Sequence, residues 1–171
     1  FWDDRPAEFA AVCVRAVLSA NRVRDAWARG TALVSVVALL YSRGRYAAAL
    51  RVAAQAERHP RGAFWQWMLA LTVASIHVQR GYPAAALSTI TAALEVPQVD
   101  RDDRLRQHLL RLQAAAIYQQ GQVNEAATLA LESYQRLSDY ANEGAIGSTA
   151  ALLALLLVEQ GRMEEAATYL A

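Results

Sequence analysis

Apolar residues recur along this chain at helical spacing, in runs that each end at a glycine. The glycines are Gly44, Gly81, Gly121 and Gly161, so the interruption recurs after 37, 40 and 40 residues. An alanine stands five residues after each glycine, and a small or β-branched residue stands seven residues before it. The alanines are Ala49, Ala86, Ala126 and Ala166, and the earlier residues are Val37, Ala74, Ala114 and Ala154. A self-similar period in this range is typical of stacked helical hairpins.

Each residue of the repeated unit has a physical role in such a hairpin. Glycine adopts the left-handed backbone that ends one helix and reverses the chain. Small residues on either side of the turn let the two antiparallel helices approach closely. An apolar residue two positions after the glycine, namely Tyr46, Val123 or Met163, is expected to close the tip. The second repeat has Pro83 there, which the first turn of a helix tolerates.

The pattern predicts an all-α chain. The expected helices cover residues 7–19, 21–42, 46–58, 63–80, 83–94, 101–120, 123–137, 140–160 and 163–171. Asn21 is the expected N-cap of the second helix, which Gly30 is expected to kink or break. Stop or start signals between the hairpins are Pro60, Pro97, Asp100, Asp102 and Asp139.

These elements group into repeats within a single predicted domain over residues 1–171. The predicted repeats span residues 21–59, 61–97, 100–138 and 139–171, and residues 1–20 form an N-terminal capping or leftover helix. The chain starts without methionine, and it ends at Ala171 inside an expected helix. A fragment of a larger protein is therefore expected.

Composition narrows the classes of partner. Of the 171 residues, 55% are hydrophobic and 19% are charged, and the net charge is +1. Such a chain can bury a sizeable core, and it gives no reason to expect nucleic acid or a membrane as partner. The longest apolar run, residues 150–158, is too short to span a bilayer. With no targeting segment in view, a cytoplasmic protein is expected.

Residues that commonly carry catalysis or bind metals are scattered. Cys13 is the sole cysteine, and its apolar neighbours indicate a core position. His59, His77 and His108 share no metal-ligand spacing, and His77 is interpreted as a core histidine with its hydrogen bonds satisfied. The sequence contains no phosphate-binding loop and no nucleophile motif. We therefore expect no enzyme activity, no metal and no cofactor.

The repeated unit resembles the tetratricopeptide-repeat family, in which Gly, an aromatic residue and then Glu-Ala open the second helix. The matches are Gly44/Tyr46/Ala49, Gly81/Ala86, Gly121/Val123/Glu125/Ala126 and Gly161/Met163/Glu165/Ala166. They cover the chain from about residue 23 onward, with a longer period than the family's ~34 residues. The resemblance implies a right-handed superhelical solenoid of about four hairpins plus an N-terminal helix.

The longer period, with Glu132-Ser133-Tyr134 before Leu137-Ser138-Asp139, is similar to repeats in large bacterial regulators. These are signal-transduction ATPases of the STAND class and LuxR-type activators of the maltose-regulon class, many of them actinobacterial. Their repeats form a sensor or autoinhibitory superhelix. The resemblance implies a non-catalytic interaction or ligand-sensing domain in transcription regulation. Its implied partners are a protein or peptide, neighbouring domains of the parent protein, or a small-molecule inducer.

The same resemblance implies a groove lined by the first helix of each hairpin. Its more distinctive residues are Tyr41, Met68, Leu71, Gln79, His108, Arg111, Tyr118, Gln119 and Glu159. Their expected neighbours are Thr31, Val34, Ala38, Ser42, Ser75, Val78, Ala115, Ser148, Ala151, Leu155 and Val158. A mostly apolar groove suits a hydrophobic helix, a neighbouring domain, a second copy of the chain or a small molecule.

Two other functions stay open. One is a self-association module, because the fourth hairpin is expected to leave Met163, Ala166, Ala167 and Leu170 partly uncovered at the end of the solenoid. The other is a helical accessory domain of an enzyme.

Of the neighbouring pair Trp65 and Trp67, one is expected in the core and the other is a candidate binding hot spot.

Overall fold

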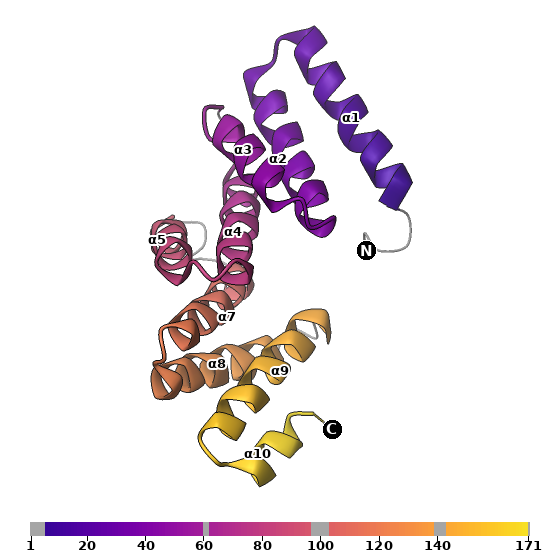
Figure 1. Cartoon of the computed structure of the whole chain (residues 1–171). Helices are drawn as coiled ribbons and strands as arrows, with labels where there is room; N and C mark the ends of the chain where they lie inside the picture. Colours follow the sequence, from indigo (N-terminus) through magenta and orange to yellow (C-terminus); the bar gives the residue numbers. More distant parts are fainter. Residues whose placement is uncertain (1–5, 60–61, 97–102, 139–142, 171) are drawn as a thin grey trace. The chain divides into compact units, whose positions relative to one another are not determined.

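All the secondary structure that the computed structural model describes is helical (Figure 1). The description covers residues 6–59, 62–96, 103–138 and 143–170. The nine helices in these ranges are α1 (Pro6–Val23), α2 (Ala26–Ser42), α3 (Tyr46–Ala56), α4 (Ala63–Gln79), α5 (Pro83–Leu94), α7 (Asp103–Gln119), α8 (Val123–Ser138), α9 (Glu143–Glu159) and α10 (Met163–Thr168). The all-α prediction is therefore confirmed for this part of the chain. The predicted signals Pro60, Pro97, Asp100, Asp102 and Asp139 lie outside the described residues.

The chain forms two compact units, Phe1–Ile76 and His77–Ala171, and each is described by itself. In the first unit α1 packs on α2, and α2 packs on α3 (Figure 1). In the second unit α5 packs on α7, α7 on α8, α8 on α9, and α9 on α10; α7 also contacts α9. Consecutive helices within each unit thus pack as pairs, which is consistent with helical hairpins. The single predicted domain and the solenoid stay predictions.

The four predicted glycine turns share one backbone geometry. The φ angles of Gly44, Gly81, Gly121 and Gly161 are +68°, +69°, +82° and +76°. At Gly121 the glycine N–H donates to the Tyr118 carbonyl (2.8 Å), and the Gln122 N–H donates to the Ile117 carbonyl (3.3 Å). This pair of bonds is the Schellman ending of a helix. The Gln122 carbonyl then accepts from the Ala126 N–H (3.0 Å), so Gln122 both ends one helix and begins the next; the same three bonds recur at the other turns.

The small residues on either side of these turns are buried, as predicted. Exposure is 0% at Ala49, Ala86, Ala126, Val37, Ala74 and Ala114, and 2% at Ala154 and Ala166. In the second unit, Ala126 and Ala154 join one core cluster with Leu153 and Leu156. Of the predicted tip residues, Tyr46 and Val123 pack against their cores. Met163 is 60% exposed, so the prediction that it closes the fourth tip is wrong.

The boundary between the first two helices differs from the prediction. Asn21 lies inside α1, and the N-cap of α2 is Asp25, whose carboxylate accepts hydrogen bonds from the N–H groups of Trp27 (2.8 Å) and Ala28 (3.1 Å). The chain reverses at Arg24, whose φ is +53°. Gly30 is buried within the continuous helix α2, so the predicted break is wrong. Both Asn and Asp are good caps, and the left-handed Arg24 is what selects Asp25.

Replacing Gly121 with alanine tests the turn geometry. A methyl group there would meet no atom within 4 Å, so the expected loss of about 1–2 kcal/mol arises from the left-handed backbone alone. Gly147→Ala is the matched control, because Gly147 lies inside α9 with equally open space; it should stabilise by about 0.5–1 kcal/mol. Urea denaturation of both variants measures the two changes. Equal effects of the two substitutions would contradict the assigned geometry.

Replacing Asp25 with alanine tests the observed helix boundary. Loss of the two capping bonds should reduce the free energy of unfolding by about 1 kcal/mol. Asn21→Ala, which removes the cap expected from the sequence, should change it by less than about 0.5 kcal/mol, as exposed substitutions usually do. Thermal denaturation followed by circular dichroism compares the variants. A larger loss for Asn21→Ala would place the boundary where the sequence pattern put it.

Candidate functional site

Two hydrogen bonds in the second unit join first helices that are equivalent in neighbouring repeats. The Tyr118 hydroxyl, on α7, donates to Glu159 Oε1, on α9, across 3.4 Å. Gln119 Nε2 donates to the carbonyl oxygen of Val78, near the end of α4, across 2.7 Å. Tyr118 and Val78 each stand three residues before a turn glycine. Their partners, Glu159 and Gln119, each stand two residues before the next turn glycine along the chain. The C-terminal turns of these helices therefore lie side by side, with Tyr118 beside Glu159 and Gln119 beside Val78.

Burial and the first of these bonds both favour the protonated phenol of Tyr118. Burial raises the pKa of Tyr118, and the charge of the Glu159 carboxylate and its hydrogen bond raise it further. Both effects disfavour the phenolate. At neutral pH the Tyr118 hydroxyl is therefore a donor. It donates to Oε1 of Glu159 and does not bond Oε2.

The same side of α7 carries the two basic residues of the predicted groove. His108, Arg111, Ala115 and Tyr118 follow at intervals of three, four and three residues, which places them along one face of the helix. His108 and Arg111 are half-buried. Burial lowers the pKa of His108, and the positive charge of Arg111 lowers it further. His108 is therefore neutral at neutral pH, and Arg111 carries the positive charge of this face.

The corresponding face of α9 is more open. Ser148, Ala151, Leu155, Val158 and Glu159 are all exposed, with Leu155 at 44% and Val158 at 41%. On α7 the equivalent positions are half-buried except for exposed Gln119. These positions of the two helices form a strip, which consists of His108, Arg111, Ala115, Tyr118 and Gln119 on α7 and Ser148, Ala151, Leu155, Val158 and Glu159 on α9. Its α7 part is basic and aromatic, and its α9 part is mostly apolar. Gln79, at the end of α4, is also exposed.

The predicted groove residues of the first unit flank its core. Tyr41 and Met68 are half-buried and pack against the cluster that contains Val37 and Ile76. The rings of Tyr41 and Tyr46 lie with their centroids 6.0 Å apart. Leu71 is half-buried on α4. Tyr41 and Met68 are therefore neighbours of one core, and a groove through all four repeats stays a prediction.

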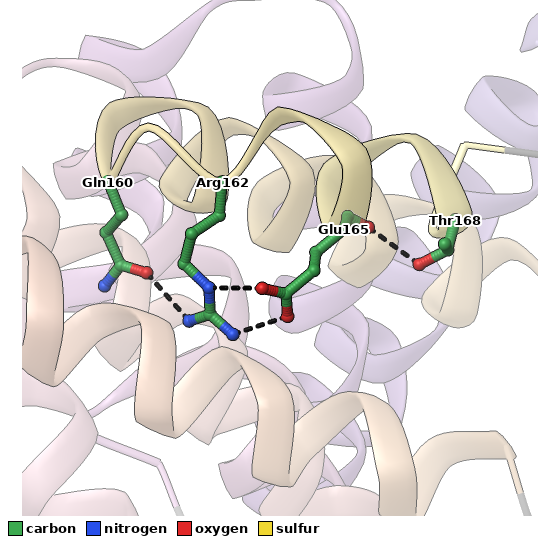
Figure 2. Close-up of polar contacts among 4 residues, drawn as sticks. All are labelled: Gln160, Arg162, Glu165 and Thr168. Carbon is green, nitrogen blue, oxygen red and sulfur yellow. Dashed lines mark hydrogen bonds and ion pairs between the residues drawn. The ribbon is translucent and has the colours of Figure 1, made fainter.

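The end of the fourth hairpin holds a polar network that the sequence did not single out (Figure 2). Arg162 donates through Nε and Nη2 to the two carboxylate oxygens of Glu165 (2.8 and 2.5 Å), and through Nη1 to Gln160 (3.2 Å). The Thr168 hydroxyl donates to the Glu165 carbonyl (2.7 Å). The Arg162 hydrogen bond lowers the pKa of Glu165. Because both partners are exposed, this ion pair orders the N-terminal turn of α10 without adding much stability.

A hollow of about 250 Å³ lies beside this network, between α8, α9 and α10. Leu131, Leu153 and Leu157 form its apolar part, and Arg162 and Glu165 stand at its polar side. Because Arg162 and Glu165 neutralise each other's charge, the hollow favours neither an anionic nor a cationic ligand. Of the residues expected to be uncovered here, Met163 (60%), Ala167 and Leu170 (68%) are exposed. Ala166 is buried, so that part of the expectation is wrong.

The remaining sequence candidates are mostly structural. Cys13 is buried at 1% exposure, which confirms its core position, and burial raises the pKa of its thiol. Trp67 is buried and Trp65 is half-buried, so the pair divides as predicted between a core and a more open position. His77 Nδ1 is buried without a hydrogen-bond partner in the described structure. The interpretation of His77 as a satisfied core histidine is therefore wrong.

No match was found for this chain among protein-family models, curated proteins or solved structures. Within the ranges that the structure describes, no three His, Cys, Asp or Glu side chains gather closely enough to hold a metal ion. No described helix has the length and apolar character needed to cross a membrane. The assignment of function accordingly rests on the strip along α7 and α9.

The lowered pKa of His108 predicts a dependence of stability on pH. An unfolded histidine titrates near pH 6.5, so between that pH and the lower folded pKa the unfolded state binds more protons. The free energy of unfolding should therefore fall as pH drops below about 6.5 and level off below the folded pKa. His108→Gln should weaken this fall, and His77, whose pKa burial also lowers, should retain part of it. Urea denaturation at pH 7.5 and 5.5 measures both slopes; identical slopes would contradict the assignment to His108.

Proposed function

We propose that this chain is a non-catalytic binding domain of the tetratricopeptide type, a superhelix of helical hairpins. It recognises a protein or peptide segment along the first helices of its hairpins. The proposal is carried by the two hydrogen bonds that join equivalent first helices, Tyr118–Glu159 and Gln119–Val78. Contacts in the same register between successive repeats are what a regular stack of hairpins requires. They also hold the half-buried face of α7 beside the exposed face of α9.

The chemistry of the strip favours an amphipathic segment. Leu155 and Val158 stand three residues apart on α9 and expose apolar side chains, which suits apolar anchors spaced along a partner helix. Arg111 on α7 carries a positive charge, and Glu159 on α9, next to Val158, carries a negative one. Such a surface binds a helix with an apolar stripe bordered by a few charged residues, rather than a densely acidic tail.

The parent protein in this proposal is a bacterial transcriptional or signalling regulator of the STAND or LuxR type. It is supported by the long repeat period, with Glu132-Ser133-Tyr134 before Leu137-Ser138-Asp139, which resembles the repeats of those regulators. In that setting the domain is cytoplasmic, and its partner is a neighbouring domain or a protein or small-molecule signal. Occupation of the strip changes its contacts with neighbouring domains.

Peptide-display selection against the purified chain tests the binding surface. Selected peptides should carry apolar residues at helical spacing. Leu155→Arg should weaken their binding at least about tenfold, because it places a charge in the apolar part of the strip. Met163→Arg is the matched control, since Met163 is an exposed apolar residue of the same hairpin at a turn position outside the strip. It should change affinity less than about twofold, as measured by calorimetry.

Two outcomes would overturn this proposal. The first is selected peptides that bind Leu155→Arg as tightly as the unchanged chain. The second is a dimer, seen by light scattering, that Met163→Arg dissociates while no peptide is selected. That result would assign the exposed side chains of Met163 and Leu170 to self-association instead.

A further inference from the structure

Electric charge is divided unequally between the two compact units. The first unit contains ten arginines and five acidic residues, a net charge of +5, whereas the second contains seven arginines and eleven acidic residues, a net charge of −4. The overall charge of +1 hides this division. In the first unit, the eight arginines that the structure describes are all exposed. A charge asymmetry of this kind favours a negatively charged partner for the first unit.

A polar cavity of about 180 Å³ lies at one end of this unit. Three segments line it, namely the end of α1, the start of α2 and the stretch that follows α3. The polar and charged residues of its lining are Asn21, Arg24, Asp25, Arg29 and His59. Neither the Arg24 nor the Arg29 guanidinium forms an ion pair with a described residue. Two arginine charges at one cavity are therefore available to a ligand.

Asp25 is the one acidic residue among the described residues of this lining. Its Oδ1 accepts hydrogen bonds from the N–H groups of Trp27 (2.8 Å) and Ala28 (3.1 Å), so the carboxylate serves as the cap of α2. The start of α2 thus already has its acceptor, and the attraction for an anion comes from the arginine side chains. With two arginines and one carboxylate, the lining keeps an excess of positive charge.

The backbone of Arg24 indicates a role for its side chain. Four other turns place a glycine in the left-handed region, whereas the turn between α1 and α2 places Arg24 there, with φ +53°. A residue with a Cβ pays a steric cost in this conformation that glycine avoids. Costs of this kind cluster at ligand-binding positions. Because glycine would form the same turn with less strain, the arginine is best explained by what its guanidinium binds in the cavity.

We propose that this cavity binds the phosphate group of a small phosphomonoester. Arg24 and Arg29 donate to the phosphate oxygens, which match the fork of a guanidinium group. A phosphomonoester carries a charge near −2 at neutral pH and three terminal oxygens, so it can engage both arginines at once. The cavity volume suits one such group rather than the row of phosphates that a nucleic acid presents. The site lies in the first unit and does not depend on the function proposed for the strip.

Titration with two matched compounds tests the proposal. Phenyl phosphate and benzenesulfonate share a phenyl ring, and benzenesulfonate carries only one negative charge. Ligand-observed proton NMR should show saturable binding of phenyl phosphate, at least about fivefold tighter than that of benzenesulfonate, because the second charge strengthens the bonds from arginine. Arg29→Gln should weaken binding of phenyl phosphate at least about tenfold. Arg15→Gln is the matched control, since Arg15 is an exposed arginine of α1 that does not line the cavity; it should change the affinity less than about twofold.

Arg24→Gly separates binding from the structural role of the turn. Because glycine adopts the left-handed backbone without the steric cost, this variant should have a higher midpoint of urea denaturation. Its affinity for phenyl phosphate should nevertheless fall at least about tenfold. A residue with a purely structural role would not combine higher stability with weaker binding.

Circular dichroism establishes that every variant is folded. Three results would overturn the proposal: no saturable binding of phenyl phosphate, equal affinity for benzenesulfonate, or binding that folded Arg24→Gly and Arg29→Gln retain. Equal weakening by Arg15→Gln and Arg29→Gln would also overturn it, because the effect would then come from the overall charge of the unit and not from the cavity. Binding of a single-stranded oligonucleotide without any binding of phenyl phosphate would overturn it in favour of a nucleic acid.

Discussion

The left-handed glycine turn is the constraint on which the rest of the structure depends. Because the glycine N–H and the next N–H bond the carbonyls three and five residues back, only three residues separate the end of the first helix from the start of the second. Two helices joined by so short a connection must contact each other from their first turns onward. That close approach is possible because buried alanines, such as Ala126 and Ala114, bring only a methyl group to the contact.

The same turn determines where the candidate site lies in the second unit. A fixed helix ending places the third and second residues before each glycine at equivalent points of every repeat. When α7 packs beside α9 and the end of α4, these points meet, and Tyr118 reaches Glu159 as Gln119 reaches Val78. Tyr118 and Val78 serve both purposes, because their carbonyls accept the glycine N–H of the turn and they also make the contacts across repeats. If the proposed function holds, substitutions at the exposed positions of α9 change recognition and leave the hairpin intact.

The sequence predicted correctly those features that are determined by residues close together along the chain. The turn glycines, the buried alanines and the paired helices all followed from a period that repeats in the residues themselves. The start of α2 did not, because Asn21 and Asp25 are both good caps and the choice depends on Arg24 adopting a positive φ. Met163 was predicted both to close the tip of its hairpin and to be partly uncovered, and only the second prediction is correct, although its spacing from Gly161 equals that of the packed Val123 from Gly121. The spacing of a residue from its turn glycine predicts its position on the helix. Whether its side chain is buried depends on the helix that packs against that position.

An open hollow between α1 and α2, beside Trp27, illustrates why small residues are ambiguous in a sequence. Alanines at the turns let two helices close on each other, whereas the alanines of α1 and α2 leave a space that indole rings border. The two pairs also differ in their connection: Gly121 joins α7 and α8 through a Schellman turn, whereas Arg24 and the Asp25 cap join α1 and α2. Ala20 of α1 is nevertheless buried at 4% exposure, so even beside the hollow some alanines make close helix contacts. A count of alanines therefore does not by itself predict how closely two helices pack.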